Sequence, residues 1–254
     1  METVRCEVCV EGVPGALAAA EGGAHRIELC AGLVEGGTTP SLGALGVVLE
    51  RVRIDTTVLV RPRGGDFLYT PEEMEVMIRD VRSIRDAGAF GIAIGALARD
   101  GGVDEEAMAA VMEAAGPMSV TFHRAFDMAR DPWRTLDTLV ELGVDRILTS
   151  GLEKSVPEGT DLIRGLVSAA GGRISIMPGG GIRRENVAGI VRETGVREVH
   201  FTAFTRGESP MLHQNSRPRM GAAEVPGEFD RLLTDPLEVR AVLQALDSAS
   251  LGGH

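Results

Sequence analysis

The stretch VRCEVCVEGVPGALAAAEGGAHRIELC, residues 4–30, contains one complete strand–helix–strand unit. Its first part alternates small apolar and polar side chains, which predicts a β-strand over residues 4–10. An alanine-rich segment predicts a helix over residues 14–22, and the next apolar run predicts a second strand over residues 26–30. Because a helix separates the two short strands, we expect them to lie parallel in one sheet.

The same unit recurs along the whole chain. Further strands are predicted at residues 57–63, 90–95, 119–123, 146–150, 174–178 and 198–202. Further helices are predicted at residues 42–53, 71–87, 104–115, 132–142, 160–170, 184–194 and 237–249. Eight strands alternating with eight helices indicate an α/β protein with a (β/α)8 TIM barrel as a single domain over residues 1–254.

Two features bear on this fold prediction. A doubly wound sheet is the alternative, but it would usually carry a glycine-rich nucleotide loop after the first strand, and residues 10–14 (VEGVP) do not form one. Residues 203–235 show little pattern, so we expect an irregular segment before the last helix. A segment of this length is often a lid, an oligomer contact or a disordered loop.

Charge and cysteine content exclude several classes of function. The chain has 26 Lys and Arg against 37 Asp and Glu, a net charge of −11, which argues against binding nucleic acid or an anionic membrane. No secretory signal and no apolar run of about 18 residues is visible, so we expect a cytoplasmic protein. The three cysteines lie within the first thirty residues, a sparse set that fits reduced thiols better than disulfides.

Chemically reactive side chains fall on the inward positions of the predicted strands. Alternate residues of a barrel strand face the interior, and the aliphatic residues of the first two strands suit the helix layer. The inward set then comprises Glu7, Cys9, Glu28, Cys30, Arg61, Arg63, His123 and His200. Ionised groups in a barrel interior cost several kcal/mol unless paired or solvated, so this set indicates a functional site. An internal salt-bridge network between the two Glu and the two Arg is the alternative interpretation.

Cys9 and Cys30 are candidate metal ligands. Neighbouring strands lie about 4.8 Å apart, so two inward cysteines on adjacent strands could place both sulfur atoms on one soft metal ion. Thiolates favour Cu(I) or Zn(II) over Mg(II) or Ca(II). Packing of two free cysteines in the core is the alternative that the residues leave open.

Other residues suggest an anion-binding and catalytic mouth. Arg61 and Arg63 belong to the loop RPRGGDF (61–67) and could clamp an anion, and Gly179, Gly180 and Gly181 could hold a phosphate through their backbone N–H groups. With these cations nearby, Glu7, Glu28 and His123 are candidates for acid–base catalysis. The remaining candidate pocket residues are Asp66, Thr149, Ser150 and His200.

Several motifs together resemble one known family. They are EVCV (7–10), RIELC (26–30), EGGTTPS (35–41), RPRGGDF (61–67), TFHRAFD (121–127), LTSG (148–151), MPGGGI (177–182) and EVH (198–200), and they resemble the CutC family. The resemblance implies a cytoplasmic TIM barrel, often a homodimer or homotetramer, tied to copper homeostasis. It also implies Cu(I) binding, because the copper-binding cysteines described in the family fall on Cys9 and Cys30. After the last His the family pattern is not kept, since the chain reads FTA (201–203) there.

Two functions therefore remain open. The first is a copper-homeostasis protein that binds Cu(I) through Cys9 and Cys30, almost linearly, with His123 or Met177 as a weak third donor. The second is a barrel enzyme acting on a small anionic metabolite that could carry a phosphate, with its reaction unassigned. We expect a copper ion or a small anion as partner, and neither nucleic acid nor a membrane.

Overall fold

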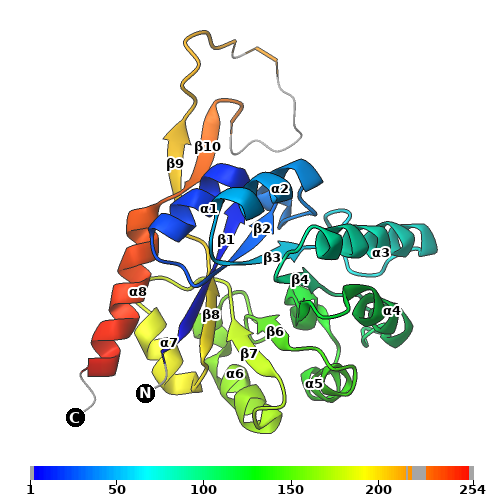
Figure 1. Cartoon of the computed structure of the whole chain (residues 1–254). Coiled ribbons are helices and arrows are strands. Elements are labelled where there is room, and N and C mark those ends of the chain that lie inside the picture. The colour runs from blue at the N-terminus through cyan, green and yellow to red at the C-terminus, as the bar shows by residue number, and fades with distance from the viewer. Residues whose placement is uncertain (1–2, 216, 219–226, 252–254) are drawn as a thin grey trace.

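Eight parallel strands form the centre of the molecule, and helices surround them (Figure 1). This computed structural model describes residues 3–215, 217–218 and 227–251. The strands are β1 (Arg5–Glu11), β2 (Arg26–Cys30), β3 (Asp55–Leu59), β4 (Gly91–Ile94), β5 (Ser119–Phe122), β6 (Arg146–Thr149), β7 (Ser175–Pro178) and β8 (Glu198–Phe201).

Helices follow the strands in alternation. They are α1 (Gly12–Glu21), α2 (Leu42–Arg51), α3 (Pro71–Asp86), α4 (Glu105–Ala115), α5 (Pro132–Glu141), α6 (Val156–Ala170), α7 (Val187–Thr194) and α8 (Pro236–Leu251). Two short 3-10 helices, η1 (Leu33–Glu35) and η2 (Arg124–Met128), lie in the loops after β2 and β5.

The strand order closes the sheet into a barrel. Neighbours run β7-β6-β5-β4-β3-β2-β1-β8, and a parallel bridge between Gly179 and His200 joins the two ends. β1 therefore pairs with both β2 and β8, which brings the first and last strands of the barrel together. This arrangement confirms the predicted TIM barrel.

Local sequence signals explain where several helices begin. Thr70 and Glu73 form a capping box at the start of α3, in which each side chain accepts a hydrogen bond from the other residue's backbone N–H. Pro71 occupies the first turn, where its missing N–H has no consequence. The side chains of Asp104 and Asp131 accept hydrogen bonds from backbone N–H groups in the first turns of α4 and α5, so these helix starts are encoded locally.

The main apolar core lies between the strands and the helices. Val8, Val10, Ile27 and Leu29 are fully buried in it, as the alternation along β1 and β2 predicts. Cys6 belongs to the same layer, and burial together with Asp247 raises the pKa of its thiol to about 12. Cys6 is therefore an inert core residue.

The structure differs from the sequence prediction in two places that concern the site. β3 ends at Leu59, four residues earlier than expected, because the chain turns through Pro62 and two glycines. Part of the segment expected to be irregular forms an antiparallel hairpin of β9 (Phe204–Glu208) and β10 (Asp230–Thr234), which projects from the barrel (Figure 1). Residues 216 and 219–226 of that segment lie outside the described residues.

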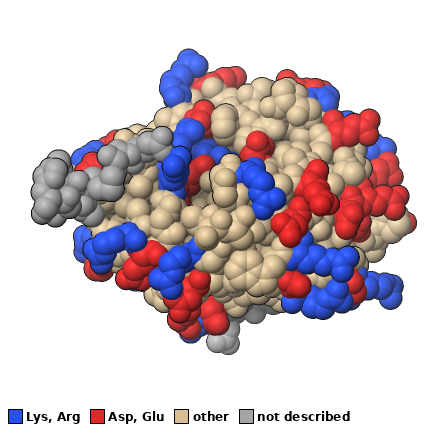
Figure 2. All heavy atoms as spheres, turned by 90° about the horizontal axis from the view of Figure 1, so that it is seen from below, with Lys and Arg blue, Asp and Glu red and all other residues tan. Residues whose placement is uncertain are grey.

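Two further observations concern the charge of the surface and the apolar character of the helices. On the face shown in Figure 2, Lys and Arg side chains are interspersed with Asp and Glu, so no extended basic surface is seen there. In the part of the chain that the structure describes, no helix combines the length and the apolar character that crossing a membrane requires.

Candidate functional site

A cavity of about 820 Å³ opens at the carboxyl ends of the barrel strands. Its floor includes Cys9, Glu28, Cys30 and His200, which come from β1, β2 and β8. Barrel enzymes and binding proteins build their sites at this end because all eight strands deliver loop residues there. The volume is large enough for a small metabolite.

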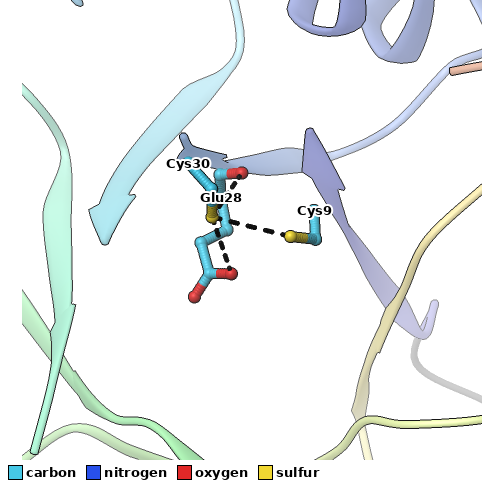
Figure 3. Close-up of side chains that lie close together, drawn as sticks. All are labelled: Cys9, Glu28 and Cys30. Atoms are coloured by element: carbon cyan, nitrogen blue, oxygen red, sulfur yellow. Dashed lines mark hydrogen bonds between the residues drawn. The ribbon is translucent and has the colours of Figure 1, made fainter. Parts of the chain in front are cut away.

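The two predicted thiols meet at the bottom of this cavity. Cys9 Sγ lies 3.6 Å from Cys30 Sγ, and Cys30 Sγ lies 3.4 Å from Glu28 Oε2 (Figure 3). In the register of the barrel Cys9 pairs with Glu28, so Cys30 stands one inward position further along β2. All three side chains are buried. The inward prediction from strand alternation is confirmed for them.

His200 connects the thiols to a polar layer beneath them. Its Nδ1 lies 2.8 Å from Glu7 Oε1, and its Nε2 lies 3.8 Å from Glu28 Oε2. Glu7 also forms an ion pair with Arg26, which bonds Glu198 at 2.5 Å. Because Glu7 is held by Arg26 on one side, its other oxygen fixes the orientation of the imidazole.

Sequence reasoning missed the lower half of this network. Arg26, Arg146 and Glu198 are inward on their strands, and Arg146 Nε bonds Glu198 Oε2 at 2.7 Å. The signal was available, because Arg26 alternates with Glu28 and Glu198 alternates with His200. The alternative interpretation, an internal salt-bridge network, is thus correct in that Glu7 forms a buried ion pair. The partner of Glu7 is Arg26, however, and not Arg61 or Arg63.

The network sets unusual protonation states. A hydrogen bond from Cys30, with help from His200, outweighs burial and lowers the pKa of Cys9 to about 6. Burial lowers the pKa of His200, but Glu28, Cys9 and Glu7 raise it well above its usual value. Burial and the charge of Cys9 raise the pKa of Glu28 to about 8. These shifts favour a thiolate at Cys9 and an imidazolium at His200, and they favour the protonated form of Glu28.

The structure corrects the predicted arginine clamp. Arg61 Nη1 donates to the carbonyls of Glu35 and Gly37 at 3.0 Å, and its Nη2 donates to the carbonyl of Gly65 at 2.7 Å. Arg61 still lines the cavity, but these loop carbonyls occupy its terminal nitrogens. Because β3 ends at Leu59, Arg61 lies among loops whose backbone carbonyls have no partner on a neighbouring strand. The guanidinium N–H groups of Arg61 donate hydrogen bonds to these carbonyls.

Arg63 lies outside the cavity lining. Its guanidinium bonds Glu73 at 2.6 Å and the carbonyls of Asp66 and Leu68, which ties the loop to the start of α3. Asp66 is an exposed partner of Arg63 and also lies outside the lining. Arg63 and Asp66, both predicted to belong to the pocket, therefore stabilise the loop after β3.

The remaining predicted residues divide into two groups. Gly179, Gly180, Gly181 and His123 line the cavity. Thr149 and Ser150 are buried beside it, where their side chains bond Asp127 at 2.5 and 3.0 Å. The last two therefore support the wall without lining it.

His123 is held as a neutral imidazole. Its Nδ1 accepts a hydrogen bond from the N–H of Ala125, so the ring proton lies on Nε2. Burial and the nearby Arg61 lower its pKa to about 3. It lies outside both groups of His, Cys, Asp and Glu side chains that could hold a metal ion in the described residues. Met177 lies outside the cavity lining, and its sulfur accepts a hydrogen bond from Arg26. Neither residue therefore joins the thiol pair as the third donor that the sequence suggested.

His123 should make stability depend on pH. Its folded pKa of about 3 lies below the unfolded value of about 6.5, so the unfolded chain binds more protons between these values. Stability from this residue is thus complete above pH ~6.5 and falls as the pH decreases. His123→Asn keeps an acceptor near Ala125, and it should reduce the slope of unfolding free energy against pH by up to about 1.4 kcal/mol per unit. Urea unfolding at several pH values measures both slopes, and parallel curves would contradict the assignment.

Comparison with known proteins identifies the family. The model of the CutC family matches residues 4–205, which covers every strand of the barrel. The chain belongs to the CutC family. The family resemblance seen in the motifs is therefore confirmed.

Curated relatives of this CutC chain agree. The proteins named "Copper homeostasis protein cutC homolog" from Mus musculus and Homo sapiens are each 48% identical over 236 residues, covering 93% of this chain and 87% and 86% of theirs. A family protein CutC from Mesorhizobium japonicum is 46% identical, covering 94% of this chain and 93% of its own.

Solved structures place the fold with the same family. A crystal structure of a copper homeostasis protein CutC from Streptococcus agalactiae matches with a TM-score of 0.75 and 33% identity, covering 78% of this chain and 98% of its own. A phosphoribosylanthranilate isomerase from Thermotoga maritima has a TM-score of 0.55 at 12% identity, covering 97% of this chain and 100% of its own. The second likeness shows the barrel fold alone.

Proposed function

We propose that this CutC family protein takes part in copper homeostasis and binds Cu(I) through Cys9 and Cys30. The observation that carries the proposal is the pair of buried sulfur atoms 3.6 Å apart, on neighbouring strands at the floor of an open cavity. Soft thiolate ligands select Cu(I) over the hard cations of the cell. The names of the mouse and human relatives support the same function.

The sulfur separation indicates a bent site. With metal–sulfur distances of about 2.3 Å, as in zinc thiolates, two sulfurs 3.6 Å apart enclose an angle of about 100° at the metal. A linear arrangement would need the sulfurs about 1 Å further apart. The near-linear geometry expected from sequence therefore does not fit this spacing, and a bent site has room for a third ligand.

In this proposal Glu28 adds a weak oxygen donor beside the two sulfurs. One of its oxygens lies within 4.8 Å of both sulfur atoms, in a group of three potential ligand atoms. His200 belongs to the neighbouring group with Glu7 and Glu28. In this proposal His200 balances the charge of the thiolates and Glu7 holds its ring in place.

The chemistry of the proposed site indicates a location in the cell. Free thiols that bind Cu(I) need a reducing compartment, so the cytoplasm is the proposed location. The expected homodimer or homotetramer stays a prediction. The second open function, an enzyme acting on an anion, depends on the opposite wall of the cavity.

Titration of the reduced protein with Cu(I) tests the proposal. Under anaerobic conditions, in competition with a chromophoric Cu(I) chelator, we expect one Cu(I) ion per chain. X-ray absorption at the copper edge should show sulfur as the main ligand atom. Copper bound only through nitrogen and oxygen, or Zn(II) displacing Cu(I) at equal concentration, would contradict a Cu(I) thiolate site.

A further inference from the structure

The cavity has a second polar wall, separate from the thiols. Arg124, Gly180 and Gly181 line it, and they come from the loops after β5 and β7. None of them belongs to the clusters of potential metal ligands in the described part of the chain. The copper proposal therefore leaves this wall without a function.

Arg124 is fixed in place before any ligand arrives. Its Nε donates to Asp127 Oδ2 at 2.7 Å and its Nη2 donates to Ser150 Oγ at 2.8 Å. Asp127 is itself held by Thr149 Oγ1 and by the N–H of Ser150. The guanidinium is thus oriented without loss of further side-chain entropy, which favours tight binding of a partner.

One nitrogen of Arg124 remains free. Its Nη1 makes no hydrogen bond within the described residues, and it lies 3.5 Å from the position that a Cβ on Gly180 would occupy. Gly180 and Gly181 have φ angles of 111° and 77°, which other residues adopt only with strain. Glycine at these positions lets the guanidinium and the loop backbone approach each other closely.

The loop backbone offers further donors. The N–H groups of Gly181 and Ile182 make no hydrogen bond to any described residue, whereas the N–H of Gly179 bonds Thr149 and the N–H of Gly180 faces His200 in the bridge between the two ends of the sheet. Successive free N–H groups form concave sites for anions. Gly180 lies beside the free nitrogen of Arg124, and Gly181 and Ile182 line the same cavity, so guanidinium and backbone donors occur together on this wall.

Buried groups of the same cavity add positive charge and another donor. Arg61 is only 7% exposed, and among the described residues no carboxylate forms an ion pair with it. His123 Nε2 is a buried N–H donor without an acceptor. Buried charges are normally paired, and the cavity next to this wall holds the buried Arg61 without a carboxylate partner among the described residues.

We propose that this wall binds the phosphate group of a small phosphate monoester, through Arg124 Nη1 and the N–H groups of Gly181 and Ile182. Charge-assisted hydrogen bonds from a guanidinium and backbone N–H groups match the oxygens of a phosphate. The organic part of the ligand points towards the half of the cavity that Arg61 and His123 line.

Acidic residues at the rim do not oppose this site. Arg184 forms ion pairs with Glu185 and Glu238, and Asp235 caps the first turn of α8. Their charges are therefore partly balanced by groups other than Arg124. The phosphate site is independent of the copper proposal, since no thiol takes part in it.

Calorimetry with glycerol 3-phosphate, with glycerol as the blank, tests the proposal on the copper-free chain. Arg124→Gln should weaken binding at least about tenfold, because a charged hydrogen-bond partner is lost. Arg130→Gln is the matched control, because Arg130 is an exposed arginine of the same loop that pairs with Asp100 outside this cavity. It should bind within about twofold of the unchanged chain.

Two further measurements keep the result interpretable. Inorganic phosphate added to the unchanged chain should shift the amide signals of Gly181 and Ile182 in nitrogen-15 NMR, even if Arg124→Gln does not fold. The chain with Cys9→Ser and Cys30→Ser should bind glycerol 3-phosphate normally. No binding at millimolar concentration, equal loss in both arginine variants, or amide shifts confined to other loops would overturn the phosphate site and leave the copper proposal intact.

Discussion

Replacing Cys9 and Cys30 together by serine is expected to abolish Cu(I) binding and to leave the barrel folded. Serine has nearly the shape of cysteine, but its hydroxyl is a hard oxygen donor that Cu(I) does not favour. Changes to groups around a metal ligand already cost about 10–100-fold in affinity, so loss of both sulfurs should exceed about 100-fold. The measurement is the anaerobic chelator competition described above.

Cys6→Ser is the matched control for the double variant. Cys6 is also a buried cysteine of β1, but it faces the helix layer and belongs to the apolar core. It should bind one Cu(I) ion as the unchanged chain does, at some expense in stability. If the double variant bound as much copper as the control, the thiol pair could not be the copper site.

Replacing Arg26 by methionine should destabilise the fold by about 3–5 kcal/mol, because it leaves a buried carboxylate without its cation. Arg26 and Glu7 are each 1% exposed at their side chains, and Glu198 is 12% exposed. Burial alone would raise the pKa of Glu7, and Arg26 followed by His200 lowers it well below its usual value. Urea unfolding of the variant measures the loss, which is a large share of the ~5–15 kcal/mol typical of a folded protein.

An exposed arginine provides the control for Arg26. Arg79 pairs with Glu75 on α3, and the two side chains are 74% and 64% exposed. Arg79→Met should change stability by no more than about 1 kcal/mol. Adding Glu7→Gln to Arg26→Met should restore part of the loss, because the unpaired charge is then removed. Equal losses in the two single variants would show that the buried network does not stabilise the barrel.

The pattern of the chain was sufficient for the fold and for the direction of the thiols. Strands and helices alternate with clear signals, such as Thr70 and Glu73 at the start of α3. Alternation along a strand has a period of two, so the inward direction of Cys9, Glu28 and Cys30 follows as soon as the strands are located. No contact distant in sequence was needed for either prediction.

Loop residues were predicted less well because loops have no such period. The sequence pattern predicts that β3 continues through Arg61 and Arg63, but the strand ends at Leu59. Beyond that point the direction of a side chain depends on which backbone carbonyls lack partners. Arg61 reaches the carbonyl of Glu35, 26 residues earlier in the chain. Arg124, which the sequence pattern did not single out, keeps its Nη1 without a hydrogen bond among the described residues, beside Gly180.

The sequence by itself determined a barrel of alternating strands and helices, and it determined that two thiols point into that barrel, because both properties repeat locally along the chain. Only the tertiary structure decided which charges meet. Closure of the barrel places β8 beside β1, so Glu7 contacts His200, 193 residues away, and Arg26 contacts Glu198, 172 residues away. Such partners are chosen by the register and geometry of the closed sheet, and no local pattern contains that information.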